Sequence, residues 1–157
     1  MTARETAVKK AIELARPRNR VVDIYNTYLP RPRGHKVLYH EQICATYASA
    51  VFIALGWTDI VPPECGAHQL FENMARLGCG IQDPKRVPLP GDLIFFGNHK
   101  YVSGIQHVGI VTAVDGKRIC YYDAAGVIRR HALPVGHNSI WGYGIPDYAS
   151  KENKGEK

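Results

Sequence analysis

The chain has 157 residues, of which 45% are hydrophobic and 22% charged, and 20 Lys and Arg against 14 Asp and Glu give a net charge of +6. This composition is typical of a globular protein and excludes a collagen-like or disordered chain. No run of about 18 apolar residues is present, so no transmembrane helix is predicted. The positive charge favours an anionic partner, such as nucleic acid, an anionic membrane or the acidic polymers of a bacterial wall.

The length suits one domain, which we place over residues 1–149, with a helical part over 1–80 and a sheet part over 90–147. Residues 150–157 are polar and charged, and we expect them to form a flexible tail. The first residues mix charges where a secretory signal would place a basic patch and an apolar run. We therefore expect synthesis in the cytoplasm without a signal peptide.

Four helices are predicted in the first half of the chain, because apolar residues recur there at intervals of three and four. Proline or glycine follows each of them as a stop signal. The four predicted helices cover residues 4–15, 19–29, 41–55 and 66–77. Residues 30–36 are expected to form a loop. Basic residues cluster beside the second helix and in this loop, at Arg16, Arg18 and Arg20 and at Arg31, Arg33 and Lys36.

After Pro90 the pattern changes to short apolar and β-branched segments separated by turns, which indicates strands. Five strands are predicted, over residues 92–96, 107–114, 118–123, 127–133 and 140–145. Helices that come first and an antiparallel sheet that follows define the α+β class rather than an alternating α/β fold.

Cys44 lies in the first turn of the predicted helix over residues 41–55. A sulfur in that position is exposed to the positive end of the helix dipole, and a histidine beside it can take its proton and stabilise the thiolate. His107 opens a predicted strand and is the candidate base. Together they predict a thiol hydrolase.

The turn between the strands over 107–114 and 118–123 decides whether Asp123 can orient His107. A two-residue Asp115-Gly116 loop would turn Asp123 to the opposite face of the sheet. A three-residue loop, Val114-Asp115-Gly116 with Gly116 in the left-handed region, would place Asp123 directly across from His107. We favour the three-residue loop.

The predicted triad is therefore Cys44 as nucleophile, His107 as base and later acid, and Asp123 as the group that fixes the imidazole tautomer. Backbone N–H groups at the start of the Cys44 helix could bind the oxyanion. His131 and Asn138 are the alternatives to Asp123 as third member.

The other cysteines are expected to be structural. A domain of this size needs no disulfide, so we predict free thiols at Cys44, Cys65, Cys79 and Cys120. The spacing Cys65-x-x-His68, with Cys79 further on, is a weak match to a zinc site. We therefore expect no metal and no cofactor.

Several motifs resemble the NlpC/P60 and CHAP superfamily of papain-like peptidoglycan hydrolases, and in particular the CHAP-type modules of phage endolysins. The resemblance covers residues 40–147. It rests on the cysteine at a helix start, on Pro90-Gly91-Asp92 before a hydrophobic strand, and on His107-Val108-Gly109-Ile110-Val111. Three later segments agree with it, namely Tyr121-Tyr122-Asp123, Val127-Ile128-Arg129-Arg130 and Trp141-Gly142-Tyr143-Gly144-Ile145-Pro146.

The resemblance implies a papain-like fold and a bacteriolytic cysteine hydrolase, with Cys44, His107 and Asp123 as its site. Its partner would be peptidoglycan, cut either at the bond between muramic acid and L-alanine or within the stem and cross-bridge peptides. We expect a monomer that binds no nucleic acid, does not insert into membranes and reaches the cell wall after release or injection.

Two alternatives remain open. One is an inactive binding module on the same fold, which would hold cell wall or nucleic acid through the two basic clusters. The other is an amidase that acts on a cytosolic isopeptide or on a lipid-linked amide.

Overall fold

The computed structural model describes residues 1–15, 18–98, 101–125 and 127–152. The helices are α1 (Ala3–Glu13), α2 (Arg18–Thr27), α3 (Cys44–Leu55) and α4 (Ala67–Arg76), and three short 3-10 helices are η1 (Pro32–Gly34), η2 (Val102–Gly104) and η3 (Tyr148–Lys151). The strands are β1 (Gly80–Ile81), β2 (Leu93–Gly97), β3 (Ile105–Asp115), β4 (Arg118–Ala125), β5 (Val127–Pro134) and β6 (Ile140–Gly144). The α+β class predicted from the sequence is confirmed.

The sheet is antiparallel in every pairing and has the strand order β1-β6-β2-β3-β4-β5. Within the described residues it has six strands, so the predicted number of five is too low. The missing strand is β1, whose two residues pair with the end of β6. A strand of two residues is too short to show an alternating pattern in the sequence.

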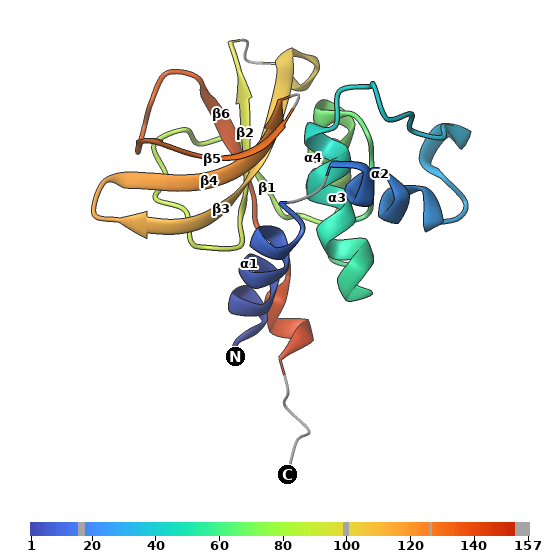
Figure 1. The fold of residues 1–157 in the computed structure, drawn as a ribbon. Coiled ribbons are helices and arrows are strands. Elements are labelled where there is room, and N and C mark those ends of the chain that lie inside the picture. Colours follow the sequence, from blue (N-terminus) through green and yellow to red (C-terminus); the bar gives the residue numbers. More distant parts are fainter. Residues whose placement is uncertain (16–17, 99–100, 126, 153–157) are drawn as a thin grey trace.

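The helices α2, α3 and α4 lie beside the sheet, and α1 packs below it together with the C-terminal segment (Figure 1). The central helix is α3, which is buried continuously from Ala45 to Phe52 because its sequence is apolar on all sides. Alternate residues of β2 belong to two different hydrophobic clusters. Leu93 and Phe95 pack against the helices, whereas Ile94 and Phe96 belong to a second, smaller cluster on the other face.

The Pro90-Gly91-Asp92 motif ties α1 to the beginning of β2. Arg4 of α1 donates from Nη1 to Asp92 Oδ1 at 2.8 Å and to the carbonyl of Pro90 at 3.0 Å. The amide of Leu89 donates to the other oxygen of Asp92 at 2.9 Å. Burial raises the pKa of Asp92 despite these hydrogen bonds. In this protein the motif is therefore a structural joint between helix and sheet.

The predicted helix over residues 41–55 begins three residues too early, since α3 starts at Cys44. Glu41 closes the preceding loop instead: its carboxylate contacts His35 Nε2 at 2.8 Å and accepts from the amide of Leu38 at 2.8 Å. These contacts hold Glu41 in the loop before the helix, and the apolar periodicity on which the prediction rested gives no sign of them.

The C-terminal segment is partly ordered, contrary to the prediction of a flexible tail over residues 150–157. Ser150 and Lys151, assigned to a flexible tail, belong to η3, and Lys151 pairs with Asp59 at 2.7 Å. Residues 153–157, like Pro17 as the stop of the first helix, lie outside the described residues. The single-domain organisation over residues 1–149 stays a prediction.

Candidate active site

Cys44 is the first residue of α3, and Ile43 precedes it as the N-cap without a side-chain hydrogen bond to the helix. The amides of the first turn of a helix have no partner inside the helix, and the positive end of the helix dipole lies there. The thiol of Cys44 is partly exposed and is not in a disulfide. The helix start thus presents an accessible sulfur beside free N–H donors.

His107 lies near the beginning of β3, directly opposite Phe96 of β2, whose ring centroid is 5.6 Å from that of the imidazole. Its Nε2 is 2.6 Å from Asp123 Oδ2, and Cys44 is near enough to the ring to raise its pKa through a hydrogen bond and its charge. Because Nε2 contacts Asp123, the remaining ring nitrogen, Nδ1, is the one left for the thiol. The structure thus brings together all three residues of the predicted triad.

The electrostatics of His107 favour its charged form. Burial by itself lowers the pKa of the imidazole, but the hydrogen bond with Asp123 and the hydrogen bond and charge of Cys44 together raise the pKa from 6.5 to about 9. At neutral pH the ring is therefore an imidazolium held between a carboxylate and a sulfur.

The register that brings Asp123 to His107 differs from the predicted one. The turn is the two-residue Gly116-Lys117, with Asp115 opposite Arg118, so the predicted three-residue loop is wrong. Gly116 does have the expected positive φ, at 60°. Asp123 lies opposite Gly109, two residues along from His107.

A β-bulge at Thr112 makes this register possible. Val111 pairs with Tyr121 and Ala113 with Cys120, so Thr112 is an extra residue on β3. Without it, Asp123 would lie opposite Ile110, and its side chain would point to the other face of the sheet. The bulge therefore places the carboxylate on the same face as His107, diagonally across the strand pair.

Gly109 leaves the space that this diagonal contact needs. A Cβ at Gly109 would lie 2.8 Å from the carbonyl oxygen of Tyr122, 2.9 Å from Cδ2 of Tyr121 and 3.3 Å from Cβ of Asp123. No side chain fits between these atoms without displacing them. From the sequence, Gly109 was recognised only as part of the His107-Val108-Gly109-Ile110-Val111 motif. The glycine two residues after the histidine is the feature of the sequence that could have indicated this space.

Of the two alternative third members, His131 lies at the site. Its Nε2 is 3.0 Å from Asp123 Oδ1, the carboxylate oxygen that His107 does not contact. Asn138 lies in the turn before β6 and lines a separate cavity with Gly97 and Trp141. The direct hydrogen bond to His107 therefore belongs to Asp123.

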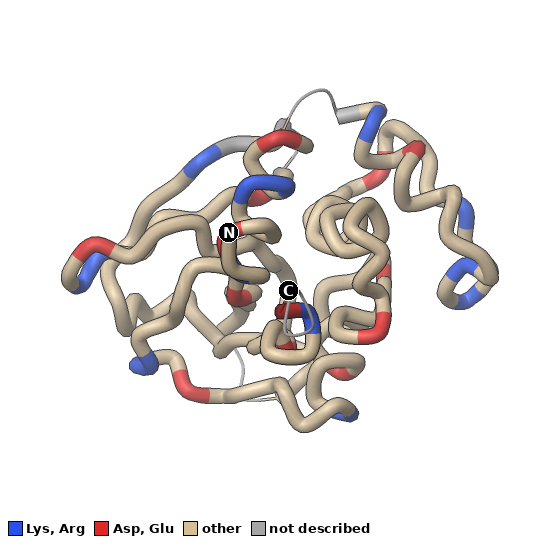
Figure 2. Tube along the Cα trace, turned by 90° about the horizontal axis from the view of Figure 1, so that it is seen from below, with Lys and Arg blue, Asp and Glu red and all other residues tan. Residues whose placement is uncertain are grey.

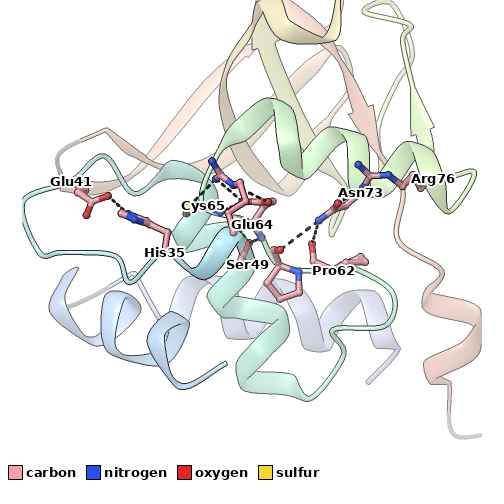
Figure 3. Close-up of polar contacts among 10 residues, drawn as sticks. His35, Glu41, Ser49, Pro62, Glu64, Cys65, Asn73 and Arg76 are labelled. Carbon is pink, nitrogen blue, oxygen red and sulfur yellow. Dashed lines mark hydrogen bonds and ion pairs between the residues drawn. The ribbon is translucent and has the colours of Figure 1, made fainter. Parts of the chain in front are cut away.

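A polar cluster holds the segments on either side of the Cys44 helix together (Figure 3). Ser49 of α3 accepts from the amide of Glu64 at 3.0 Å and donates to its carbonyl at 2.8 Å. The buried carboxylate of Glu64 binds Arg33 through two contacts, at 2.8 and 3.3 Å, and accepts from the amide of Cys65 at 2.9 Å. Arg33 also contacts the sulfur of Cys65 at 3.2 Å. This cluster was not predicted, because its partners are 31 or more residues apart or are joined through backbone atoms.

The described members of the two basic clusters differ in their surroundings. Figure 2 shows Lys and Arg spread around the outline of the molecule. Arg33 is paired with Glu64, and Arg20 lies 3.7 Å from Glu13. Arg16 and the side chain of Arg18 lie outside the described residues. Arg31 and Lys36 line a cavity beside α2.

The cysteines of the described chain are all free thiols, as predicted. The described ranges hold no cluster of three or more His, Cys, Asp or Glu side chains placed to bind a metal ion. In the same ranges, none of the helices has the length and apolar character needed to cross a bilayer.

Two solved structures are similar to the chain over about two thirds of its length. The chain is similar to the crystal structure of Ly7917 with the hydrolyzing product of MDP (TM-score 0.47, 16% identity, 66% of this chain and 53% of that chain). It is similar to the crystal structure of Ly7917 itself at a TM-score of 0.46 and 19% identity, over 68% of this chain and 53% of that one. The chain thus spans about half the length of the solved structures that it matches. Among curated proteins, none matches the sequence.

The family comparison covers more than half of the sequence. The sequence model of the CHAP domain matches residues 34–125, a segment that contains Cys44, His107 and Asp123. The resemblance stated from the motifs is confirmed. The chain belongs to the CHAP domain family.

Proposed function

We propose that this protein is a cysteine hydrolase that cleaves an amide bond of peptidoglycan, with Cys44 as nucleophile, His107 as proton carrier and Asp123 as its orienting partner. The observation that carries the proposal is the contact of one imidazole with both a thiol at a helix start and a buried carboxylate. This arrangement activates a sulfur nucleophile in thiol hydrolases.

The reaction follows from the charges of the three groups. The Cys44 thiolate attacks the amide carbonyl carbon, and an oxyanion forms next to the first-turn amides of α3. His107, charged at neutral pH because its pKa is raised to about 9, gives its proton to the departing amine nitrogen as the C–N bond breaks. The product of this step is a thioester on Cys44 and a free amine.

Water completes the cycle. Neutral His107 takes a proton from a water molecule, the resulting hydroxide attacks the thioester carbonyl, and the carboxylic acid product leaves as the thiolate is restored. Asp123 keeps the imidazole in one orientation through both steps. Loss of one hydrogen-bond donor to an oxyanion typically costs about 3 kcal/mol in the transition state, so the free amides at Cys44 are a substantial part of the proposed catalysis.

Peptidoglycan is the substrate that the family resemblance and the charge of the chain favour. The net charge of +6 suits an anionic wall polymer. The scissile bond is either the N-acetylmuramoyl-L-alanine amide or a stem or cross-bridge peptide bond.

Digestion of purified peptidoglycan tests this proposal. We expect new amino termini, identified by mass spectrometry, with wild-type protein and none with Cys44→Ala. A terminal L-alanine would identify an amidase, and a terminus inside the stem or cross-bridge would identify an endopeptidase. Cys79→Ala is the matched control, since Cys79 is another half-buried thiol and should be dispensable. Equal digestion by Cys44→Ala and wild type would refute the proposal.

A further inference from the structure

Asp123 is a buried carboxylate with two different imidazole neighbours. Its exposed fraction is 5%. Oδ2 contacts His107 at 2.6 Å, whereas Oδ1 lies 3.0 Å from His131 Nε2. The second contact is at ion-pair distance without hydrogen-bond alignment, because Oδ1 has no hydrogen-bond partner within the described residues. His131 is therefore the polar group that faces the otherwise unsatisfied oxygen.

The strand register fixes His131 in this place. His131 of β5 pairs with Tyr121 of β4, and Asp123 is two residues further along β4 on the same face. The ring of Tyr121 stacks on that of His131 at 5.5 Å with an interplanar angle of 27°, and packs on Phe96 at 5.2 Å. Phe96 in turn contacts His107. The adjoining rings of Tyr121 and Phe96 thus pack against the two imidazoles, Tyr121 against His131 and Phe96 against His107.

A buried carboxylate needs both oxygens occupied to stay in one orientation. With only His107 as partner, the side chain could rotate about its last bond, and the unpaired oxygen would carry a desolvation cost. A contact at the second oxygen prevents this rotation of the carboxylate and offsets part of the desolvation cost. His131 is 42% exposed at its side chain, so it faces the carboxylate on one side and water on the other.

We propose that His131 is a positioning residue that holds the Asp123 carboxylate at its second oxygen and so keeps the His107 imidazole aligned with Cys44. This inference rests on the proposed function, and it adds a fourth member to the site. His131 acts through Asp123 and takes no part in bond breaking itself.

The test compares His131→Phe with wild type. Phenylalanine retains a ring that can stack on Tyr121 but cannot contact the carboxylate. We expect kcat for peptidoglycan hydrolysis to fall roughly ten- to a hundredfold, by analogy with the loss of an outer partner of a metal-bound histidine, while KM stays nearly unchanged. We also expect NMR titration to show the pKa of His107 falling from about 9 toward its ordinary value.

His131→Gln provides a second variant, because its amide N–H can reach the same oxygen as His131 Nε2. We expect it to recover part of kcat and of the His107 pKa. His137→Phe is the matched control: His137 is an exposed histidine that hydrogen-bonds only locally to Ser139 at 2.7 Å, and its replacement should change neither quantity.

The titration of His107 needs no substrate, so it separates this inference from the proposed function. A wild type that leaves peptidoglycan intact would refute the function, yet the pKa of His107 would still report on His131. Unchanged His107 titration in His131→Phe would overturn the inference, and so would a His131→Gln variant no better than His131→Phe.

Discussion

Asp123 lies opposite Gly109 and reaches the imidazole of His107 diagonally, at 2.6 Å between Oδ2 and Nε2. Diagonal neighbours across a strand pair are further apart than direct ones, so this contact needs an open space between the two side chains. The absent side chain of Gly109 supplies that space. The geometry of the site therefore depends on a residue that carries no functional group.

Gly109→Ala is expected to damage both stability and the site. Its new Cβ would lie 2.8 Å from a backbone oxygen, and overpacking of this kind typically costs about 1 to 3 kcal/mol in the free energy of unfolding. Because Tyr122 or Asp123 must move, we also expect the pKa of His107 to fall and peptidoglycan hydrolysis to drop at least roughly tenfold. Urea unfolding, NMR titration and hydrolysis rates measure the three effects.

Gly142→Ala is the matched control for this variant. Gly142 lies on β6, and a Cβ there would be 2.3 Å from the carbonyl oxygen of Ile81, so the crowding is at least as severe but lies at the β1–β6 edge of the sheet, separated from β3 by β2. We expect a loss of stability with the His107 titration unchanged. If both variants changed that titration alike, Gly109 would have no special relation to Asp123.

The stability of the protein should depend on pH through His107. Burial opposes protonation, but Asp123 and Cys44 raise the pKa of the folded protein to about 9, above the ordinary 6.5. The stabilising contribution is therefore fully present below pH 6.5 and is lost as the pH rises through 9. Its size is on the order of 3 kcal/mol.

Urea unfolding of wild type and His107→Gln between pH 6 and 10 measures this contribution. We expect the stability difference between the two proteins to shrink across the window, because only the wild type loses an imidazolium there. A difference that stays constant from pH 6 to 10 would show that His107 is not held in its charged form.

Arg4→Ala should weaken the joint between α1 and β2. The substitution removes the 2.8 Å contact to the 1% exposed side chain of Asp92 and leaves a buried carboxylate without its cation. Breaking a pair of this kind costs about 3 kcal/mol, measured as a loss in the free energy of unfolding. Lys9→Ala, an exposed basic residue on the same helix, should change it by less than about 0.5 kcal/mol. Equal stabilities of the two variants would contradict the structural role given to the motif.

Much of the fold was predictable because its signals are local. Helix periodicity, the stop residues and the change to alternating segments after Pro90 gave the α+β class and the order of the elements. The position of Cys44 near a helix start followed from the same pattern. The two-residue strand β1 and the contacts of Glu41 were missed, since neither produces a periodic signal.

The sequence was enough to select the three residues that the structure brings together, but not to predict how they meet. Cys44, His107 and Asp123 were identified from residue type and position, whereas the β-bulge at Thr112 depends on packing between strands and has no clear sequence signature. The predicted turn was wrong, and the contact forms because the bulge shifts the register by one residue. The Arg33–Glu64 pair was not predictable either, because its members are separated by 31 residues.

The reactivity of Cys44 toward iodoacetamide as a function of pH tests the central claim most directly, namely that its sulfur and the His107 imidazole work as a pair. Peptide mapping resolves Cys44 from Cys79, in which burial raises the pKa of the thiol and slows alkylation. We predict that at pH 6 Cys44 is alkylated much faster than Cys79 in the wild type, and that His107→Gln removes this difference. Alkylation of Cys44 at the same slow rate in both proteins would contradict the account.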